Sequence, residues 1–330
     1  MFEMVQLLAG TSLFLLAFSV LIFDIPRYTL SLLSLALFGL WRRRRSAPVG
    51  NTSVSVIIPT FNGGSGLAAV FSDPRVAGAC CNIAIANERE SLWTGLQSVE
   101  YLMSISAGKS MLDVADAISC LSGACSMYRR DTFLRQGGLD PGPGEDLEYS
   151  LRLRRLGHVI RFVPDAWAQT DGPTSAIGLL RQRARWDRDA LRIRLMMYGE
   201  LRFFHRFERL PDTLQRLDFI VFDLVPTLTL PFYLVYVVLL FGADAARFLG
   251  AIYLLLLWIS IFNMGLAFVM FNRSIGLFGL GAALIFPLYQ GVYLKCARFF
   301  SYSSEIIFAS SRRDDFVPPR VLRALLGDRV

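Results

Sequence analysis

The chain has 330 residues, of which 54% are hydrophobic, and a formal net charge of +7. This length allows one compact domain and several membrane spans, but not two large domains. The apolar fraction exceeds that of an ordinary soluble protein. Lys109 and Lys295 are the only lysines, so arginine supplies nearly all of the positive charge. The arginines cluster beside apolar segments, which favours an anionic membrane surface and argues against a nucleic-acid partner.

Two apolar runs open the sequence. Residues 5–23 carry no charge and are long enough to cross a bilayer, and residues 28–41 form a shorter run that stops at four arginines, 42–45. Because positively charged loops stay on the cytoplasmic side, residues 1–45 are predicted to form a transmembrane hairpin followed by a cytoplasmic segment. A cleavable signal peptide is the alternative, but Glu3 and the absence of a small-residue cleavage site disfavour it.

Charged residues, glycines and prolines return between residues 46 and 198. Residues 53–59 predict a buried strand, and residues 159–163 predict a second one that ends at Pro164. Residues 90–106 and 146–156 carry apolar side chains at helical spacing. Alternating strands and helices predict an α/β layered domain at residues 46–198.

The remaining sequence returns to membrane character. Residues 199–217 mix aromatic side chains with arginines and predict an interfacial basic amphipathic helix, with a solvated surface helix as the alternative. Apolar segments at 219–241, 248–271 and 275–293 predict a C-terminal transmembrane region over 218–300. The tail, 301–330, is basic enough to prefer the cytoplasm, which an odd number of spans would not allow. The 275–293 segment is therefore a candidate re-entrant or interfacial segment.

Cysteines and short motifs add little chemistry of their own. Five cysteines with no recurring spacing predict reduced thiols rather than a disulfide framework, and they lack zinc-site spacing. These cysteines are Cys80, Cys81, Cys120, Cys125 and Cys296. Gly108-Lys109-Ser110 looks like the end of a phosphate-binding loop, but Met103 occupies the place of its first glycine.

Two motifs in the predicted domain are informative together. Gly144-Glu145-Asp146 follows a Pro-Gly-Pro loop and opens a helical stretch; alone it would be an ordinary acidic first turn. Gln182-Arg183-Ala184-Arg185-Trp186 follows it and precedes the membrane-proximal basic helix; alone it would be a basic surface helix. In this order beside a membrane, the two resemble motifs of the membrane-bound family 2 glycosyltransferases. The synthases of cellulose, chitin, hyaluronan and poly-N-acetylglucosamine are members of that family.

The resemblance implies a truncated GT-A-like α/β domain, of the nucleotide-diphospho-sugar transferase type, flanked by transmembrane helices. Asp146 corresponds to the catalytic base, with Glu145 shaping its surroundings. Arg185 supplies positive charge for the leaving diphosphate, Trp186 a face for an acceptor sugar, and Gln182 a hydrogen bond. Two further stretches resemble substrate-binding segments of the family. They contain Ser122 and Gly123 on the acceptor side and Thr60 and Asn62 at the end of the first strand.

One part of the family pattern is missing. Members bind Mg²⁺ or Mn²⁺ with an Asp-x-Asp motif, but here Gly64 runs almost directly into the segment beginning at Ser65, and neither that motif nor the preceding acidic one is present. Asp187-Arg-Asp189 has the right letters but falls after the Trp186 motif, where a helix face explains it better. This gap predicts that the chain keeps the acceptor half of the site and has lost most of the donor half, which argues against intrinsic transferase activity.

The leading hypothesis is an inverting membrane glycosyltransferase that moves a sugar from a nucleotide-sugar donor to a glycan or lipid-linked acceptor. The alternative is a catalytically silent relative that serves as a scaffold or partner of an active polysaccharide synthase. A transporter fits less well, because the apolar segments carry few ionisable residues besides Asp223. The expected location is the inner cell membrane, in contact with lipids, with several spans and the α/β domain in the cytoplasm.

Overall fold

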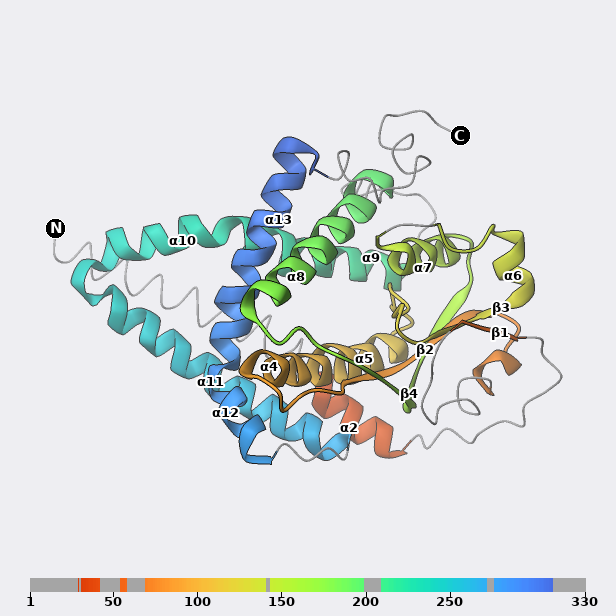
Figure 1. The fold of residues 1–330 in the computed structure, drawn as a ribbon, viewed down its shortest axis with the longest axis horizontal. Coiled ribbons are helices and arrows are strands. Elements are labelled where there is room, and N and C mark those ends of the chain that lie inside the picture. Colours follow the sequence, from red (N-terminus) through yellow and green to blue (C-terminus); the bar gives the residue numbers. More distant parts are fainter. Residues whose placement is uncertain are drawn as a thin grey trace.

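The computed structural model describes residues 29, 31–41, 54–57, 69–140, 143–198, 209–271 and 276–310. The first half contains α2 (Ser31–Trp41), β1 (Val54–Ile57), η2 (Val70–Ser72), β2 (Val76–Ile85), α4 (Leu92–Tyr101), η3 (Leu102–Gly108), α5 (Lys109–Val114), β3 (Ser126–Arg129), α6 (Arg130–Arg135), α7 (Glu145–Arg155) and β4 (Val159–Thr170). The second half contains α8 (Ala176–Leu191), η4 (Arg192–Met197), α9 (Leu210–Asp218), η5 (Phe219–Leu224), α10 (Val225–Phe241), η6 (Gly242–Asp244), α11 (Ala245–Met270), α12 (Gly276–Leu288), η7 (Tyr289–Tyr293) and α13 (Leu294–Phe308). A small sheet and long helices occupy opposite ends of the molecule (Figure 1).

The four strands pair in the order β1-β3-β2-β4, with only β2 and β4 parallel. Strand β2 is buried along its whole length, as its continuous apolar run requires for a strand with neighbours on both sides. Strand β4 continues to Thr170, so the predicted end at Pro164 is wrong. The ladder breaks between Cys81 and Asn82, and Asn82 Nδ2 donates to the carbonyl oxygen of Pro164 (3.3 Å). An irregularity of this kind accommodates a proline that cannot donate to the ladder.

Each face of the sheet is covered by apolar side chains. One face packs against Phe71 of η2. The other packs against Tyr149 and Leu153 of α7, which are fully buried. Strands between apolar layers confirm the predicted α/β class, and the predicted helices at 90–106 and 146–156 are present as α4–η3 and α7.

A disulfide joins Cys81 of β2 to Cys125, just before β3. The expectation that all five cysteines are reduced thiols is therefore wrong for this pair. The reason is the strand register: Cys80 lies opposite Ser126, so the next pair along the two antiparallel strands brings Cys81 and Cys125 together, with Cα atoms 5.7 Å apart. Cys80, Cys120 and Cys296 are free thiols.

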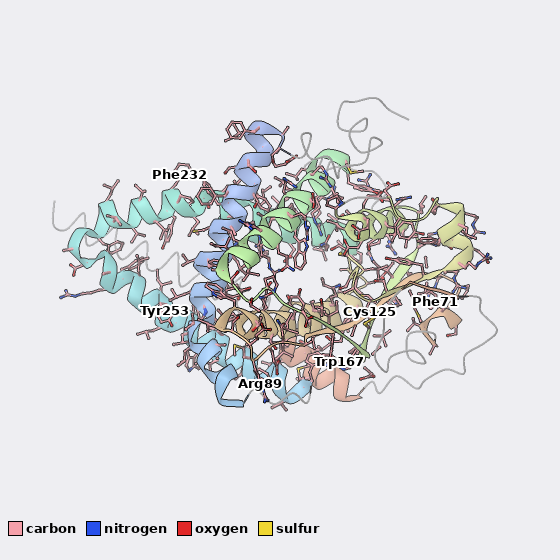
Figure 2. All side chains as sticks on the ribbon, viewed as in Figure 1. Phe71, Arg89, Cys125, Trp167, Phe232 and Tyr253 are labelled. Atoms are coloured by element: carbon pink, nitrogen blue, oxygen red, sulfur yellow. A yellow bond between two sulfur atoms is a disulfide. The ribbon has the colours of Figure 1, made fainter. Side chains whose placement is uncertain are left out.

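One of the long helical stretches has the length and composition of a membrane span. Among the described residues, one helical stretch is long and apolar enough to cross a membrane: Leu210–Met270, 61 residues. It turns at η6, so that α10 and α11 form the two arms of a hairpin pointing away from the sheet (Figure 1). Large apolar side chains stand exposed on both arms, such as Phe232 at 73% and Trp258 at 69%, and Figure 2 shows Phe232 on the outer side of α10. The predicted first span, 5–23, lies outside the described residues.

The C-terminal helices dock on the α/β domain. Leu96 of α4 and Leu179 of α8 share one buried cluster with Phe286 of α12 and Leu294 of α13. The 275–293 segment, the predicted re-entrant or interfacial piece, thus lies against the domain as α12 and η7; its relation to a membrane stays a prediction. Helix α13 runs on to Phe308, past residue 301 where the predicted tail begins.

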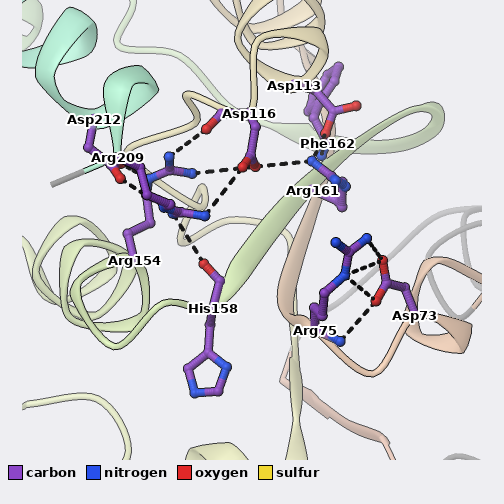
Figure 3. A network of polar contacts seen from close by, with 10 residues as sticks. All are labelled: Asp73, Arg75, Asp113, Asp116, Arg154, His158, Arg161, Phe162, Arg209 and Asp212. Atoms are coloured by element: carbon purple, nitrogen blue, oxygen red, sulfur yellow. Dashed lines mark hydrogen bonds and ion pairs between the residues drawn. The ribbon is translucent and has the colours of Figure 1, made fainter. Parts of the chain in front are cut away.

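A network of ion pairs fastens α9 to the domain (Figure 3). Asp212 of α9 contacts both Arg154 of α7 and Arg209 (3.1 Å from Nε). Asp116, after α5, pairs with Arg209 (3.3 Å) and with Arg161 of β4 (3.2 Å). Because Arg154 is nearly fully buried, removing its carboxylate partners would leave a buried cation uncompensated. The network therefore fixes where the helical stretch starts relative to the sheet.

A second close contact fixes the start of α7. Gly144 has φ = 82°, a conformation that L side chains rarely adopt, and Arg192 Nη2 donates to the carbonyl oxygen of Pro143 (2.9 Å). A Cβ atom on Gly144 would lie 2.6 Å from Ile193 Cδ1 and 3.2 Å from Asp189 Cβ. Only glycine therefore lets the end of α8 and η4 pack directly on the Glu145-Asp146 turn.

The disulfide predicts a stability difference. Replacing Cys81 and Cys125 together by serine should lower the free energy of unfolding by about 4 kcal/mol, since the bond closes a loop with a sequence separation of 44. Thermal unfolding of the detergent-purified chain would show a lower midpoint. Cys296→Ser, at an exposed free thiol, is the control and should leave the midpoint unchanged. Equal midpoints for all three proteins would mean that the bond does not form.

The glycine contact predicts a difference between the two ends of one helix. Gly144→Ala and Gly157→Ala both place a side chain at positive φ, near 82° and 81°, but only the first meets neighbouring atoms. Each should cost about 1–2 kcal/mol for the conformation, and Gly144→Ala about 1–3 kcal/mol more for overpacking. Denaturation of both variants measures the difference, and equal losses would argue against the close packing of Ile193.

Candidate active site

The acidic motif lies at the N-terminus of α7. Asp146 Oδ2 accepts a hydrogen bond from the Gly123 amide (3.0 Å), and Oδ1 accepts one from the Leu147 amide (2.7 Å). Both oxygens are thereby oriented, and the N-terminal end of a helix favours negative charge. Asp146 is half-buried and Gly123 is exposed, so the carboxylate faces the surface beside the Gly123 turn.

Hydrogen bonds from the backbone and from Lys109 hold the Gly123 turn in place. Cys125 N donates to Ser122 O (3.0 Å), which closes the turn. Lys109 of α5 donates from Nζ to Ser122 Oγ and to Cys120 O (3.0 Å). A Cβ atom on Gly123 would lie 3.4 Å from Asp146 Oδ2, so glycine keeps the approach to the carboxylate open.

Lys109 has a role that the sequence does not predict, because Gly108-Lys109-Ser110 resembles only the end of a phosphate-binding loop. In the structure this segment is helical, at the junction of η3 and α5. The available signal was compositional: Lys109 is the only lysine in the predicted α/β domain.

Glu145 connects the two motifs electrostatically. Burial raises the pKa of Glu145 above its usual value, and the neighbouring charge of Asp146 raises it further. The positive charge of Arg185 acts on the same carboxyl in the opposite direction. Arg185 lies on α8 and Glu145 on α7, and Gly144 packs against Asp189 of α8, so the N-terminus of α7 lies next to the C-terminal part of α8.

The other members of the second motif present polar and aromatic groups. Gln182 Oε1 is buried and accepts no hydrogen bond from the described residues. Trp186 is 39% exposed, and the guanidinium carbon of Arg183 lies 4.7 Å from its ring centroid. Arg185 is exposed, as a group that meets a substrate phosphate would be. An acceptor atom without a donor and a partly exposed indole ring are features that can bind a sugar.

The structure thus brings together Glu145, Asp146, Ser122 and Gly123, and places Gln182, Arg185 and Trp186 on the adjacent helix. Thr60 and Asn62, the expected nucleotide contacts, lie outside the described residues. Arg129, at the end of β3, has a structural role: it donates to the carbonyl oxygens of Phe71, Asp73 and Val76.

The metal expected from the family pattern does not fit the residues that the structure describes. Among them, no group of three or more His, Cys, Asp or Glu side chains could hold an ion. Asp187 pairs with Arg298 (3.2 Å) and Asp189 with Arg192 (2.9 Å), so the Asp-x-Asp at this place serves helix packing. No step of the chemistry below is routed through a metal.

Comparisons with known proteins agree with these motifs. The sequence profile of the family described as "Glycosyl transferase family group 2" matches residues 65–286, more than half of the chain. Chitin synthase 5 of Verticillium dahliae is 29% identical over 212 residues, which are 55% of this chain and 11% of that protein. An N-acetylglucosaminyltransferase of Mesorhizobium japonicum is 30% identical over 145 residues, 41% of this chain and 34% of that protein. The chain therefore spans only a minor part of the length of these relatives.

A solved mannosyltransferase, PcManGT from Pyrobaculum calidifontis in complex with GDP-Man and Mn²⁺, is 14% identical with a TM-score of 0.43. That alignment covers 81% of this chain and 68% of the mannosyltransferase. The sheet between apolar layers and the extent of the family match are the stronger findings. The protein is a member of glycosyl transferase family group 2.

Proposed function

We propose that this chain takes part in transferring a sugar from a nucleotide-sugar donor to a glycan or lipid-linked acceptor, with inversion at the sugar carbon. The observation that carries the proposal is the position of Asp146. Its carboxylate lies beside the exposed Gly123 amide, and Arg185 of the second motif acts on the adjacent Glu145. A base and a cation on neighbouring helices are what this transfer requires.

In the proposed reaction Asp146 accepts the proton of the acceptor hydroxyl while that oxygen attacks the anomeric carbon of the donor sugar. The bond from that carbon to the diphosphate breaks, and the nucleoside diphosphate leaves with the electron pair. Arg185 offers a forked set of donors for the charge on the leaving phosphate.

Acceptor binding rests on the remaining motif residues. Gln182 Oε1 has no donor among the described residues, so a sugar hydroxyl would satisfy it. Trp186 offers an open aromatic face on which a sugar ring can stack. Because the named relatives are a chitin synthase and an N-acetylglucosaminyltransferase, UDP-N-acetylglucosamine is the first donor to test and chito-oligosaccharides are the first acceptors.

A second function is favoured by the arrangement of Asp187 and Asp189. Both carboxylates are committed to arginines, and the sequence has no other Asp-x-Asp motif. A chain that binds the acceptor without a donor site would act as a scaffold or partner of an active synthase. Binding of nucleotide sugars distinguishes the two functions.

The test is calorimetry of UDP- and GDP-sugars on the detergent-purified full chain, with and without Mn²⁺, followed by a transfer assay. A transferase should bind a donor, and Asp146→Asn should lower the transfer rate about 10²- to 10⁴-fold, the usual contribution of a general base. Asp131→Asn is the matched control, because Asp131 is an exposed acid in the first turn of the neighbouring helix α6.

Three results would separate the possibilities. Donor binding and loss of transfer only in Asp146→Asn support the transferase. Acceptor binding without any donor binding supports the silent partner. Equal transfer by Asp146→Asn and the wild type would remove Asp146 from the proposed role.

We further propose that the protein is a multi-pass membrane protein whose α/β domain faces the cytoplasm. The hairpin of α10 and α11 with exposed apolar side chains supports membrane contact. Helix α9 supports an interfacial position, because Leu210, Leu214 and Leu217 form an exposed apolar stripe while Asp212 faces the domain. Arginines 42–45 favour a cytoplasmic position for the domain that follows them. The Cys81–Cys125 disulfide argues for the opposite side, because disulfides rarely persist in the reducing cytoplasm.

Membrane vesicles decide the orientation. In inside-out vesicles, trypsin should cleave the arginine-rich α/β domain, and in right-side-out vesicles the domain should be protected. The reverse pattern would place the domain outside the cytoplasm, in the compartment that the disulfide favours.

A further inference from the structure

One carboxylate connects the C-terminal helices to the second motif. Glu100, at the end of α4, accepts hydrogen bonds at Oε2 from the Tyr289 hydroxyl (2.6 Å) and from Arg183 Nη2 (2.8 Å). Tyr289 begins η7 and is only 2% exposed, and the side chains of Glu100 and Arg183 are also mostly buried. Three elements that are far apart in sequence therefore meet at a single oxygen atom.

Arg183, which is held by Glu100, also contacts the ring of Trp186. The two residues are three positions apart on α8, and the guanidinium carbon lies 4.7 Å from the indole centroid. A free arginine would lose side-chain entropy to hold this position, but the ion pair with Glu100 already fixes it. With Arg183 fixed on one side, the ring presents its remaining exposed surface in one orientation.

The contact of Tyr289 differs from an ordinary tie between helices. Tyr293, from the same short element, also donates its hydroxyl toward α8, but to the backbone oxygen of Ala176 (2.6 Å). Tyr289 instead donates to a charged group that is shared with Arg183, and hydrogen bonds to charged groups are the stronger ones. The chain thus contains an internal control for the effect of anchoring η7 on α8.

We propose that Tyr289, Glu100 and Arg183 are positioning residues of the acceptor site. Together they hold the Trp186 ring in the orientation that stacks on a sugar of the glycan acceptor. Acceptor binding then depends on the docking of the C-terminal helices, although none of the three residues touches the acceptor. This inference rests on the proposed function, in which Trp186 binds the acceptor.

The experiment compares Tyr289→Phe with Tyr293→Phe in the detergent-purified full chain. Each change removes one hydroxyl and keeps the ring, so packing is matched. Binding of N-acetylglucosamine tetramer, measured by calorimetry, should weaken about tenfold or more in Tyr289→Phe, the scale of one hydrogen bond to a charged group. Tyr293→Phe should stay within about twofold of the wild type.

A second readout reports on Trp186 without any ligand. Subtracting the fluorescence of the Trp186→Phe protein, in each background, isolates the emission of this one tryptophan. In the Tyr289→Phe background, acrylamide should quench that emission more strongly than in the wild type. In the Tyr293→Phe background, quenching should be unchanged.

The outcomes separate this inference from the proposed function. Unchanged quenching in Tyr289→Phe, or equal loss of tetramer binding in both tyrosine variants, would overturn the positioning role. Binding that survives Trp186→Phe would overturn it as well. If the wild type binds no tetramer, the proposed chitin-type acceptor fails, while the quenching comparison still supports or overturns the restraint on Trp186.

Discussion

The site depends on a close approach of backbone and side chain at Gly144. Because this residue has no Cβ and adopts φ = 82°, Ile193 and Asp189 can pack directly on the turn that begins α7. That packing places the acidic motif of α7 beside α8, which carries Gln182, Arg185 and Trp186. Asp146 lies on α7, whereas Arg185 and Trp186 lie on α8, so the proposed site requires both helices.

The surrounding ion pairs extend this arrangement into the helical region. The ion pairs of Asp116 and Asp212 connect α9 to α7 and to the sheet. The ion pair between Asp187 and Arg298 connects α8 to α13. Arg154 is buried, and a buried charge is costly to separate from its partner, so this network fixes geometry more than it adds stability. A site built on α7 and α8 is therefore held at a set position relative to the apolar hairpin of α10 and α11.

The sequence allowed prediction of those features that depend on local pattern. The helical spacing of apolar residues predicts α4 and α7, and the two motifs indicate the family. Contacts between distant segments had no local signal: the Cys81–Cys125 bond depends on strand register, and the extension of β4 past Pro164 depends on a break in its pairing with β2. The carboxylate of Glu100 could not be linked to Tyr289, 189 positions away, without the fold. The role of Lys109, which is to hold the Gly123 turn, has no local sequence signal because it depends on the fold bringing α5 next to that turn.

The most direct test of the assembled site is a double-mutant cycle between Gly144→Ala and Ile193→Val, measured as free energy of unfolding. Ile193→Val alone removes the Cδ1 methyl from a buried side chain and should cost about 0.5–1.5 kcal/mol. In the Gly144→Ala background the same deletion makes room for the added Cβ, so it should cost nothing or restore stability, with a coupling of about 1 kcal/mol or more. Additive losses would contradict the contact between α7 and η4, and with it the convergence of the two motifs.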